Sequence, residues 1–388
     1  MPILDNLANT ALNLGTVLVV LVALVVAHEF GHFVVARLAD VRVHEFGIGL
    51  PPRALTYHRG KETAYTLNWL PLGGFVRLEG EDGDSADPRS FSRKSLPVRT
   101  VILVAGVIMN FLVAWLIFSL IAGLADPTVG IRVNAFAPTT SSGQVSPAET
   151  AGLTPAQVTG NDANGPIYDD SGDVILAIDG QTFNWFDAGA GGAPDGGIRY
   201  LRAHAGQTVT LTVRHADGTV SEVPVTLNTA DVAAKQGALG IRNYGFIPGS
   251  SVQRGPLEAL QVGFQRTVQA SMLVLNALRD LVSNLTNPQV AGPIGIVKVM
   301  RKHIEHGPRY AFWIVSAISI YLGLFNLLPL PGLDGGRLVF LGWEAISRRR
   351  VNQRIEQTVH MIGVLMLLTL IVVISFKNDL GLGRLFRH

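Results

Sequence analysis

The sequence predicts a polytopic α-helical membrane protein, with four transmembrane helices and a β-rich extracytoplasmic domain inserted between the second and the third. Three observations lead to this fold class. Only 15% of the 388 residues are charged, against about 25% in an ordinary soluble domain, and the mean hydropathy is +0.33. Four apolar stretches approach the roughly 20 residues that a helix needs to cross a bilayer. The long segment between the middle two has the short apolar runs and turn pairs of antiparallel strands.

The first apolar stretch carries the ionisable residues His28, Glu29 and His32. It has no preceding Lys or Arg and no small-residue cleavage site, so we predict a retained membrane helix rather than a signal peptide. The other stretches are almost free of charge. The four predicted spans are residues 11–36, 101–125, 311–333 and 358–376.

The distribution of Lys and Arg predicts the orientation of these spans. The loop between the first two spans holds ten Lys or Arg, and the loop between the last two holds five. Because cytoplasmic loops are enriched in these residues, we expect both loops in the cytoplasm. Both chain termini and the inserted domain are then extracytoplasmic, in a multi-pass protein embedded in the lipid bilayer.

Composition also excludes several classes of function. The formal net charge is only +2 and no long Lys/Arg run is present, so we expect no nucleic-acid partner. The absence of cysteine excludes thiol nucleophiles, iron–sulfur clusters and cysteine zinc sites.

The sequence His28-Glu29-Phe30-Gly31-His32 is an H-E-x-x-H motif. On a helix, the two histidines lie one turn apart on the same face, which suits two ligands of one tetrahedral Zn²⁺. Glu29 lies beside them and is predicted to be the catalytic base that transfers a proton from water to the leaving amine. Ionisable residues inside a membrane helix are costly and indicate function.

A zinc site with an open fourth position needs a third protein ligand. Asp334 follows the third apolar stretch within Asn326-Leu-Leu-Pro329-Leu-Pro331-Gly-Leu-Asp334-Gly-Gly. The prolines and glycines unwind the backbone there and make room for a polar niche. Asp334 is the predicted metal ligand, and His360 stays open as an alternative.

These motifs resemble the site-2 protease family of intramembrane zinc metalloproteases, in the subgroup of the bacterial regulator of sigma-E protease. The resemblance covers most of the chain in the right order. It extends to a Gly-rich segment in a membrane-reentrant β-loop, to the strand after it, to a motif in the second span and to a segment before the third. These four segments are Phe46-Gly47-Ile48-Gly49, Leu72-Gly73-Gly74-Phe75-Val76, Ala105-Gly106-Val107-Ile108-Met109-Asn110, and residues 292–296.

The resemblance implies zinc at His28, His32 and Asp334, with Glu29 as the base. It also implies substrate-binding roles, each of which has a plain structural alternative. Asn326 is expected to hold the substrate or the developing oxyanion. Gly47 and Gly49 are expected to let a loop approach an extended substrate backbone. Asn110 is a weaker candidate, because a GxxxN pattern also serves helix packing.

The inserted domain resembles a single PDZ domain, whereas the sigma-E regulator type has two in tandem. Residues 155–171 look like an insertion in the PDZ pattern, so no groove residues are predicted. The motifs that carry this resemblance are Ser146-Pro147-Ala148, Ala151-Gly152-Leu153 and Gly172-Asp173-Val174-Ile175. The predicted domains are a membrane core at 1–125, the PDZ-like domain at 126–245, an amphipathic connection at 246–310 and a second membrane core at 311–388.

The function implied by the resemblance is regulated intramembrane proteolysis in the bacterial inner membrane. The substrates would be single-pass membrane proteins, such as anti-sigma factors or signal-peptide remnants, cleaved in or near their transmembrane segment. The PDZ-like domain would bind a peptide or a C-terminus. The main alternative is a catalytically inactive PDZ scaffold or sensor with a structural metal site. A metal transporter is a third hypothesis, but the second span offers no charged residue to such a path.

Overall fold

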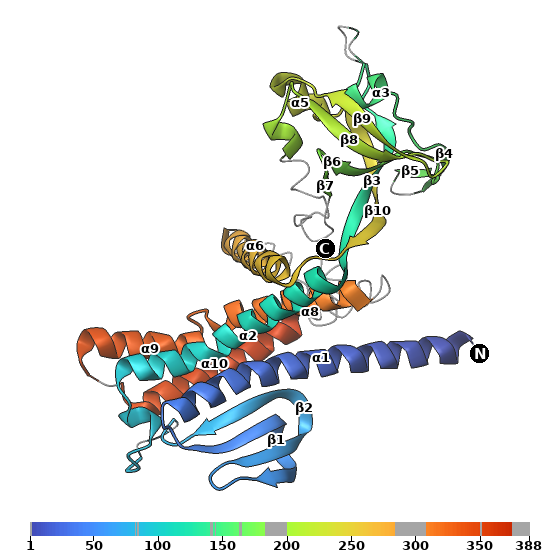
Figure 1. Cartoon of the computed structure of the whole chain (residues 1–388). Helices are drawn as coiled ribbons and strands as arrows, with labels where there is room; N and C mark the ends of the chain where they lie inside the picture. Colours follow the sequence, from blue (N-terminus) through green and yellow to red (C-terminus); the bar gives the residue numbers. More distant parts are fainter. Residues whose placement is uncertain are drawn as a thin grey trace, which may run out of the picture. The chain divides into compact units, whose positions relative to one another are not determined.

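The computed structural model describes residues 2–81, 83, 85–139, 143, 145–162, 165–182, 200–283, 308–349 and 351–374. The chain divides into two compact units (Figure 1). One combines Met1–Ser119 with Leu260–His388, and the other is Leu120–Ala259. The segment at 292–296, which carries part of the family resemblance, lies outside the described residues.

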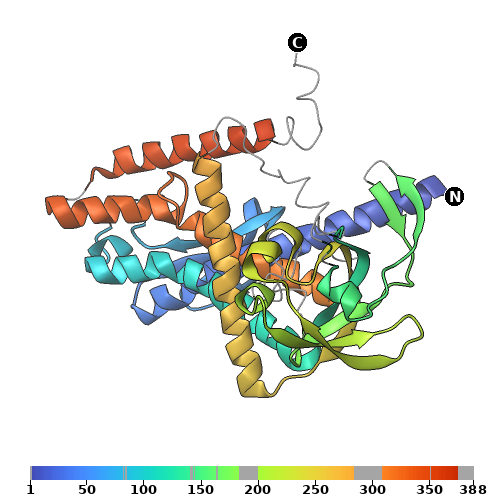
Figure 2. The ribbon, with the colours of Figure 1, turned by 90° about the horizontal axis from the view of Figure 1, so that it is seen from above.

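Helices dominate the first unit. The described helices of this unit, two of which extend past its boundary, are α1 (Pro2–Leu38), the short η1 (Phe91–Arg93), α2 (Leu96–Ala125), α6 (Pro256–Ser283), α8 (Pro308–Asn326), α9 (Asp334–Ser347) and α10 (Gln353–Ile374). A buried apolar cluster joins the end of α1 to α2 and α9 through Ala36, Ile102 and Leu341. Helices α9 and α10 run side by side in both views (Figures 1 and 2), and the rings of Phe340 and His360 have centroids 5.6 Å apart.

The prediction of a polytopic protein with four transmembrane helices is wrong. Among the described residues, two helical stretches are long and apolar enough to cross a membrane, Gly15–Leu38 and Leu96–Leu124. The third predicted span breaks at Asn326 because prolines follow, which leaves the short apolar helix Ala311–Asn326. The fourth continues past the described residues. Antiparallel sheet also makes up much more of the molecule than a helical class implies.

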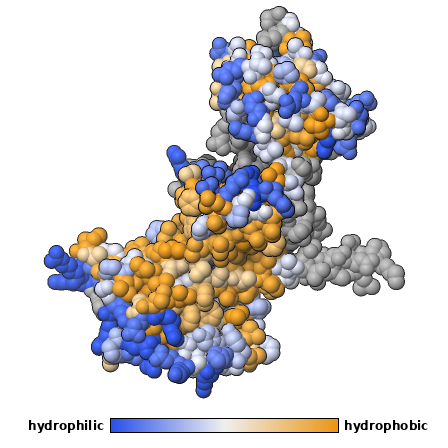
Figure 3. Space-filling model, in the orientation of Figure 1, coloured by the Kyte–Doolittle hydropathy of each residue, from blue (hydrophilic) through white to orange (hydrophobic). Residues whose placement is uncertain are grey.

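The surface of the helical unit is divided by polarity. Figure 3 shows apolar side chains over its helices and hydrophilic side chains around the end where α1 stops and α2 begins. Helix α2 has no charged residue after Arg99, and many of its large apolar side chains, such as Leu116 and Leu120, are exposed. Such an apolar surface is typical of a helix that contacts lipid rather than water.

Two long strands follow α1 and form an antiparallel sheet, β1 (Val43–Arg59) and β2 (Ala64–Leu78). Both strands fold back on themselves. Residues 46–48 pair with 74–76 on one side and with 65–67 on the other, while residues 53–58 pair with 65–68. Residues 74–78 are therefore an edge of this sheet, with β1 as their partner in the described part of the chain.

The second unit is built around an antiparallel sheet with strand order β10-β3-β6-β8-β9, and β7 pairs with β6. Its core is formed by apolar residues of these strands, including the fully buried Val133, Leu211 and Val213. Its PDZ-like character stays a prediction. The strands are β3 (Asp126–Phe136), β6 (Val174–Ile178), β7 (Gln181–Thr182), β8 (Thr208–Arg214), β9 (Val220–Thr226), β10 (Ile241–Val252) and the separate hairpin β4 (Val158–Asp162) with β5 (Gly165–Tyr168); the helices are α3 (Pro147–Thr150) and α5 (Ala230–Gln236).

Candidate metal centre

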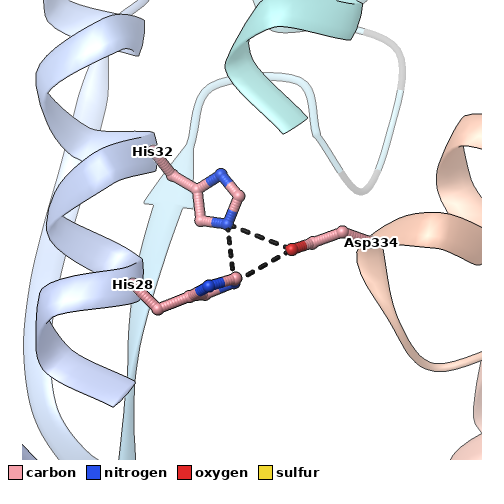
Figure 4. A group of neighbouring side chains, drawn as sticks. All are labelled: His28, His32 and Asp334. Atoms are coloured by element: carbon pink, nitrogen blue, oxygen red, sulfur yellow. Dashed lines mark hydrogen bonds and ion pairs between the residues drawn. The ribbon is translucent and has the colours of Figure 1, made fainter. Parts of the chain in front are cut away.

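Three predicted metal ligands from two distant parts of the sequence meet in the helical unit (Figure 4). His28 and His32 lie one turn apart on α1 and are 3% and 8% exposed. Asp334 is the first residue of α9. Its Oδ2 lies 3.0 Å from Nε2 of His28 and 3.2 Å from Nε2 of His32, and the two nitrogens are 3.1 Å apart.

The arrangement of these three atoms fits a single tetrahedral zinc ion. Ligand atoms about 2.0–2.1 Å from a zinc ion lie about 3.3 Å from one another, close to the three distances observed. Two imidazoles and one carboxylate are a ligand set of catalytic rather than structural zinc sites, because they leave a fourth position for water or substrate. The donor chemistry and the spacing therefore both suit zinc.

Helix α2 supports both imidazoles from behind. Nδ1 of His32 lies 2.8 Å from the backbone carbonyl of Ile102, and Nδ1 of His28 lies 3.1 Å from the side-chain amide of Asn110. A carbonyl can only accept, so Nδ1 of His32 donates and its Nε2 keeps the lone pair that a metal requires. No sequence pattern indicates the Ile102 contact, because every residue has a backbone carbonyl.

Two glycines allow α1 and α2 to approach closely at the site. A Cβ on Gly31 would lie 2.4 Å from the carbonyl oxygen of Ala105. A Cβ on Gly106 would lie 2.4 Å from Nε2 of His32 and 2.7 Å from Nε2 of His28. The GxxxN pattern from Gly106 to Asn110 indicated helix packing in the sequence, whereas Gly31 stood out only as part of the H-E-x-x-H motif. Glycine in the interior of an otherwise apolar helix is the signal that indicates such an approach.

The loop before α9 delivers Asp334 to the histidines. Gly332 adopts a φ of 95°, which favours glycine. A Cβ on Gly335 would lie 2.0 Å from the carbonyl oxygen of Leu328, so the loop folds tightly over the start of the helix. His360, the alternative third ligand, instead accepts a hydrogen bond from the N–H of Gly332 through Nδ1 at 2.8 Å. The structure therefore groups Asp334 with the two histidines and places His360 against the loop.

Two ion pairs connect α9 to other elements. Arg99 of α2 makes a bidentate contact with Glu344, at 3.0 and 2.7 Å, and both side chains are largely buried. Arg337 pairs with Glu81 in the segment after β2. The residues on α9 are seven apart and share one face, so both pairs resist rotation of the helix that carries Asp334.

Glu29 and Asn326 lie at the margins of this group. A Cβ on Gly74, at the edge of the β1–β2 sheet, would lie 3.6 Å from Cγ of Glu29, so Glu29 is beside this edge. Asn326 ends α8, and its Nδ2 is 3.5 Å from Nε2 of His28. An acid/base group and an amide donor thus stand near the same three ligands.

The predicted substrate-binding glycines lie within the sheet. Gly47 pairs with Phe75 and Thr66 on its two sides, and a Cβ there would lie 2.4 Å from the ring of Phe75. Gly49 has a φ of 81°, and a Cβ there would lie 2.7 Å from the carbonyl oxygen of Leu70. Both glycines allow close packing inside the sheet, and the edge beside Glu29 belongs to residues 74–78 instead, where the backbone N–H of Val76 donates to the Glu29 carboxylate.

Comparison with known proteins covers most of the chain. The profile of Peptidase family M50 matches residues 16–370. The chain belongs to this family. A Clostridium acetobutylicum protein named "Putative zinc metalloprotease" is 30% identical over 92% of the chain and 94% of the relative. The Geobacillus kaustophilus protein "Zinc metalloprotease RasP" is 25% identical over 93% of the chain and 96% of the relative.

Peptidase family M50 is the site-2 protease family that the motifs resemble, so that prediction is confirmed. The family is membrane-embedded, and its members are metalloproteases. In this chain the H-E-x-x-H motif lies on Gly15–Leu38, one of the two described helical stretches that could cross a membrane.

Proposed function

We propose that the chain is a zinc-dependent intramembrane endopeptidase that cleaves single-pass membrane proteins in or near their transmembrane segment. The observation that carries this proposal is the convergence of His28, His32 and Asp334 at tetrahedral spacing beside Glu29. The position of two of these ligands on an apolar helix supports chemistry at membrane depth. We propose the bacterial inner membrane as its location, with relatives in bacteria as support.

In this proposal the three ligands hold zinc, which when bound supplies Lewis acidity that polarises the scissile carbonyl and lowers the pKa of water. Glu29 takes the proton from the attacking water and delivers it to the departing amine nitrogen. Asn326 donates a hydrogen bond from Nδ2 to the carbonyl oxygen as negative charge develops on it. The low-dielectric surroundings strengthen both contributions.

A substrate helix must unwind before its backbone can be attacked, because a helix uses its own carbonyls in internal hydrogen bonds. We propose that the extended stretch adds to the sheet edge at residues 74–78, next to Glu29. Gly47 and Gly49 then support the substrate indirectly, by letting their strand pack closely behind this edge.

The second unit is proposed to select substrates through a peptide end. A cavity of about 270 Å³ is lined by apolar side chains of the sheet and α5, including Ile131, Ile175 and Ile241. The exposed Arg202 also lines it. An apolar pocket with one cationic group suits a peptide that ends in a carboxylate.

Removing the metal with a chelator and then adding Zn²⁺ back tests the proposal. Purified protein in detergent is expected to carry one zinc per chain, to lose cleavage of a tagged single-pass substrate after chelation and to regain it with added Zn²⁺. Bound zinc without cleavage of any substrate tested would instead support the inactive scaffold. Cleavage that survives complete removal of metal would contradict the proposed mechanism.

A further inference from the structure

We propose that Asn110 is a positioning residue that selects the tautomer of His28 needed for zinc binding. This inference rests on the proposed zinc site and assigns Asn110 a role different from substrate contact. Asn110 is fully buried on α2, and its side chain contacts Nδ1 of His28, the ring nitrogen that does not face Asp334.

Helix α8 packs closely against α2 at Asn110. The hydroxyl of Ser319 on α8 donates to the backbone carbonyl of Asn110 at 2.9 Å, and Ser319 is itself fully buried. Gly323, one turn further along α8, leaves room for the Asn110 side chain, since a Cβ there would lie 3.2 Å from the Asn110 Cβ. Helices α1, α2 and α8 therefore meet at this amide.

The chemistry of imidazole decides which amide atom must face His28. A zinc ion bound at Nε2 uses the lone pair of that nitrogen, so the ring proton must be on Nδ1. Nδ1–H then needs an acceptor, and Asn110 is the partner that the described residues provide. The amide oxygen must therefore point at His28 when zinc is bound.

The amide atom that lies nearest to His28 in the structure is Nδ2 of Asn110, which suits the other tautomer of the ring. With the ring proton on Nε2, that nitrogen donates to Oδ2 of Asp334 at 3.0 Å, and Nδ1 accepts from Nδ2 of Asn110 at 3.1 Å. In this arrangement Oδ1 of Asn110 is buried and has no hydrogen-bond partner among the described residues. A half-turn of the amide exchanges the two atoms and changes little in shape.

The two zinc histidines therefore differ in their support. The carbonyl of Ile102 can only accept, so it fixes one tautomer of His32 with or without metal. Asn110 can donate or accept, so it suits either tautomer of His28 without burying a charge. A carboxylate at this position would serve only the tautomer that binds zinc through Nε2, and an alkyl group would serve neither.

Zinc affinity measured by chelator competition tests this role on the full-length protein in detergent. Asn110→Leu and the smaller Asn110→Ala remove the acceptor and are expected to weaken zinc binding about 10- to 100-fold, as loss of a partner of a metal-bound histidine does. Asn110→Asp keeps an acceptor and is expected to stay within a few-fold of wild type. Ser316→Ala is the control, because Ser316 is also fully buried and its hydroxyl donates to the carbonyl of Phe312 within α8.

The pattern across these variants separates the outcomes. Equal zinc affinity in Asn110→Leu, Asn110→Ala and wild type would overturn the inference, and so would an equally large loss in Asn110→Asp, since that would show a need for the donor. A wild-type protein that binds no zinc would overturn the proposed zinc site itself. If Asn110→Leu does not fold, the comparison of Asn110→Ala with Asn110→Asp decides the question.

Discussion

At the scale of single residues, the candidate metal centre depends on a glycine beside the ligands as well as on the ligands themselves. The imidazoles of His28 and His32 occupy the space that a Cβ on Gly106 would need. Helices in an apolar environment gain little from burying apolar surface against one another, so small residues that permit close contact determine where they pack. Because Gly106 has no side chain, α2 can contact both zinc ligands at this position of the helix.

Gly106→Ala tests this steric argument. The added methyl group would lie 2.4 Å from Nε2 of His32, so the ring must move and zinc affinity is expected to fall at least about tenfold. Gly342→Ala on α9 is the matched control, because nothing lies within 4 Å of its new Cβ. Zinc titration of both variants checks the prediction, which fails if the two bind zinc equally well.

Asp334→Asn tests the third ligand. The change removes the negative charge and replaces one ligand oxygen with an amide group, so zinc content after dialysis is expected to drop well below one per chain. Measuring zinc and protein concentrations on the same sample gives the ratio. Full occupancy in this variant would contradict the ligand assignment.

The sequence could identify the groups with reactive chemistry, because H-E-x-x-H has a spacing that only a helix brings to one side. It could also point to Asp334, since a carboxylate after a broken apolar helix needs a partner. It could not reveal the hydrogen bond from His32 to the carbonyl of Ile102 or the position of Asn110 behind His28. Those contacts depend on the relative rotation of α1 and α2, which local pattern does not specify.

At the scale of elements, α9 is the part that must be held for Asp334 to reach the histidines. The buried pair of Arg99 and Glu344 connects α9 to α2, and Arg337 with Glu81 connects it to the segment after β2. Removal of one partner from a buried ion pair leaves an uncompensated charge, which costs about 3–5 kcal/mol.

Arg99→Leu is therefore expected to lower both the free energy of unfolding, by about 3 kcal/mol, and the zinc affinity. Glu258→Gln is the control, because the exposed Glu258 pairs with Arg254, which lies just before α6, and the expected loss there is below about 0.5 kcal/mol. Denaturant unfolding in detergent and zinc titration provide the two readouts. Unchanged zinc affinity in Arg99→Leu would show that α9 is positioned by other contacts.

The β1–β2 sheet contains a carboxylate that should make its stability depend on pH. Burial alone raises the pKa of Glu45, but hydrogen bonds from Thr66, Arg53 and Arg77 outweigh it and hold the pKa below its usual value. Stability from this group is then fully present above the unfolded pKa of about 4.3 and is lost as the pH falls through the lower folded value.

Glu45→Gln is expected to lower the free energy of unfolding by about 1–2 kcal/mol at pH 7, because the charged hydrogen bonds are weakened. The difference from wild type should shrink as the pH falls below the unfolded pKa of about 4.3, because the unfolded state then takes up a proton before the folded state does. Unfolding curves of both proteins between pH 3 and 7 measure this. A constant difference across that range would show that folding does not change the pKa of Glu45.

At the scale of the whole molecule, the chain forms two compact units. The second unit, Leu120–Ala259, is inserted between the two sequence segments of the helical unit. The change from long apolar stretches to short strand patterns predicts a separate domain at residues 126–245. The count of four spans was wrong, because apolar composition alone does not show where Pro329 and Pro331 end a helix. The M50 match over residues 16–370 spans both units.

The most direct test of zinc-dependent intramembrane proteolysis compares wild type with Glu29→Gln in the same membranes, using a tagged single-pass substrate. Glu29→Gln removes the proton acceptor but none of the three predicted ligands, so it should retain zinc. The account predicts a cleavage product from wild type that chelation abolishes, and a rate at least about 100-fold lower from Glu29→Gln. Equal cleavage by the two proteins would contradict it.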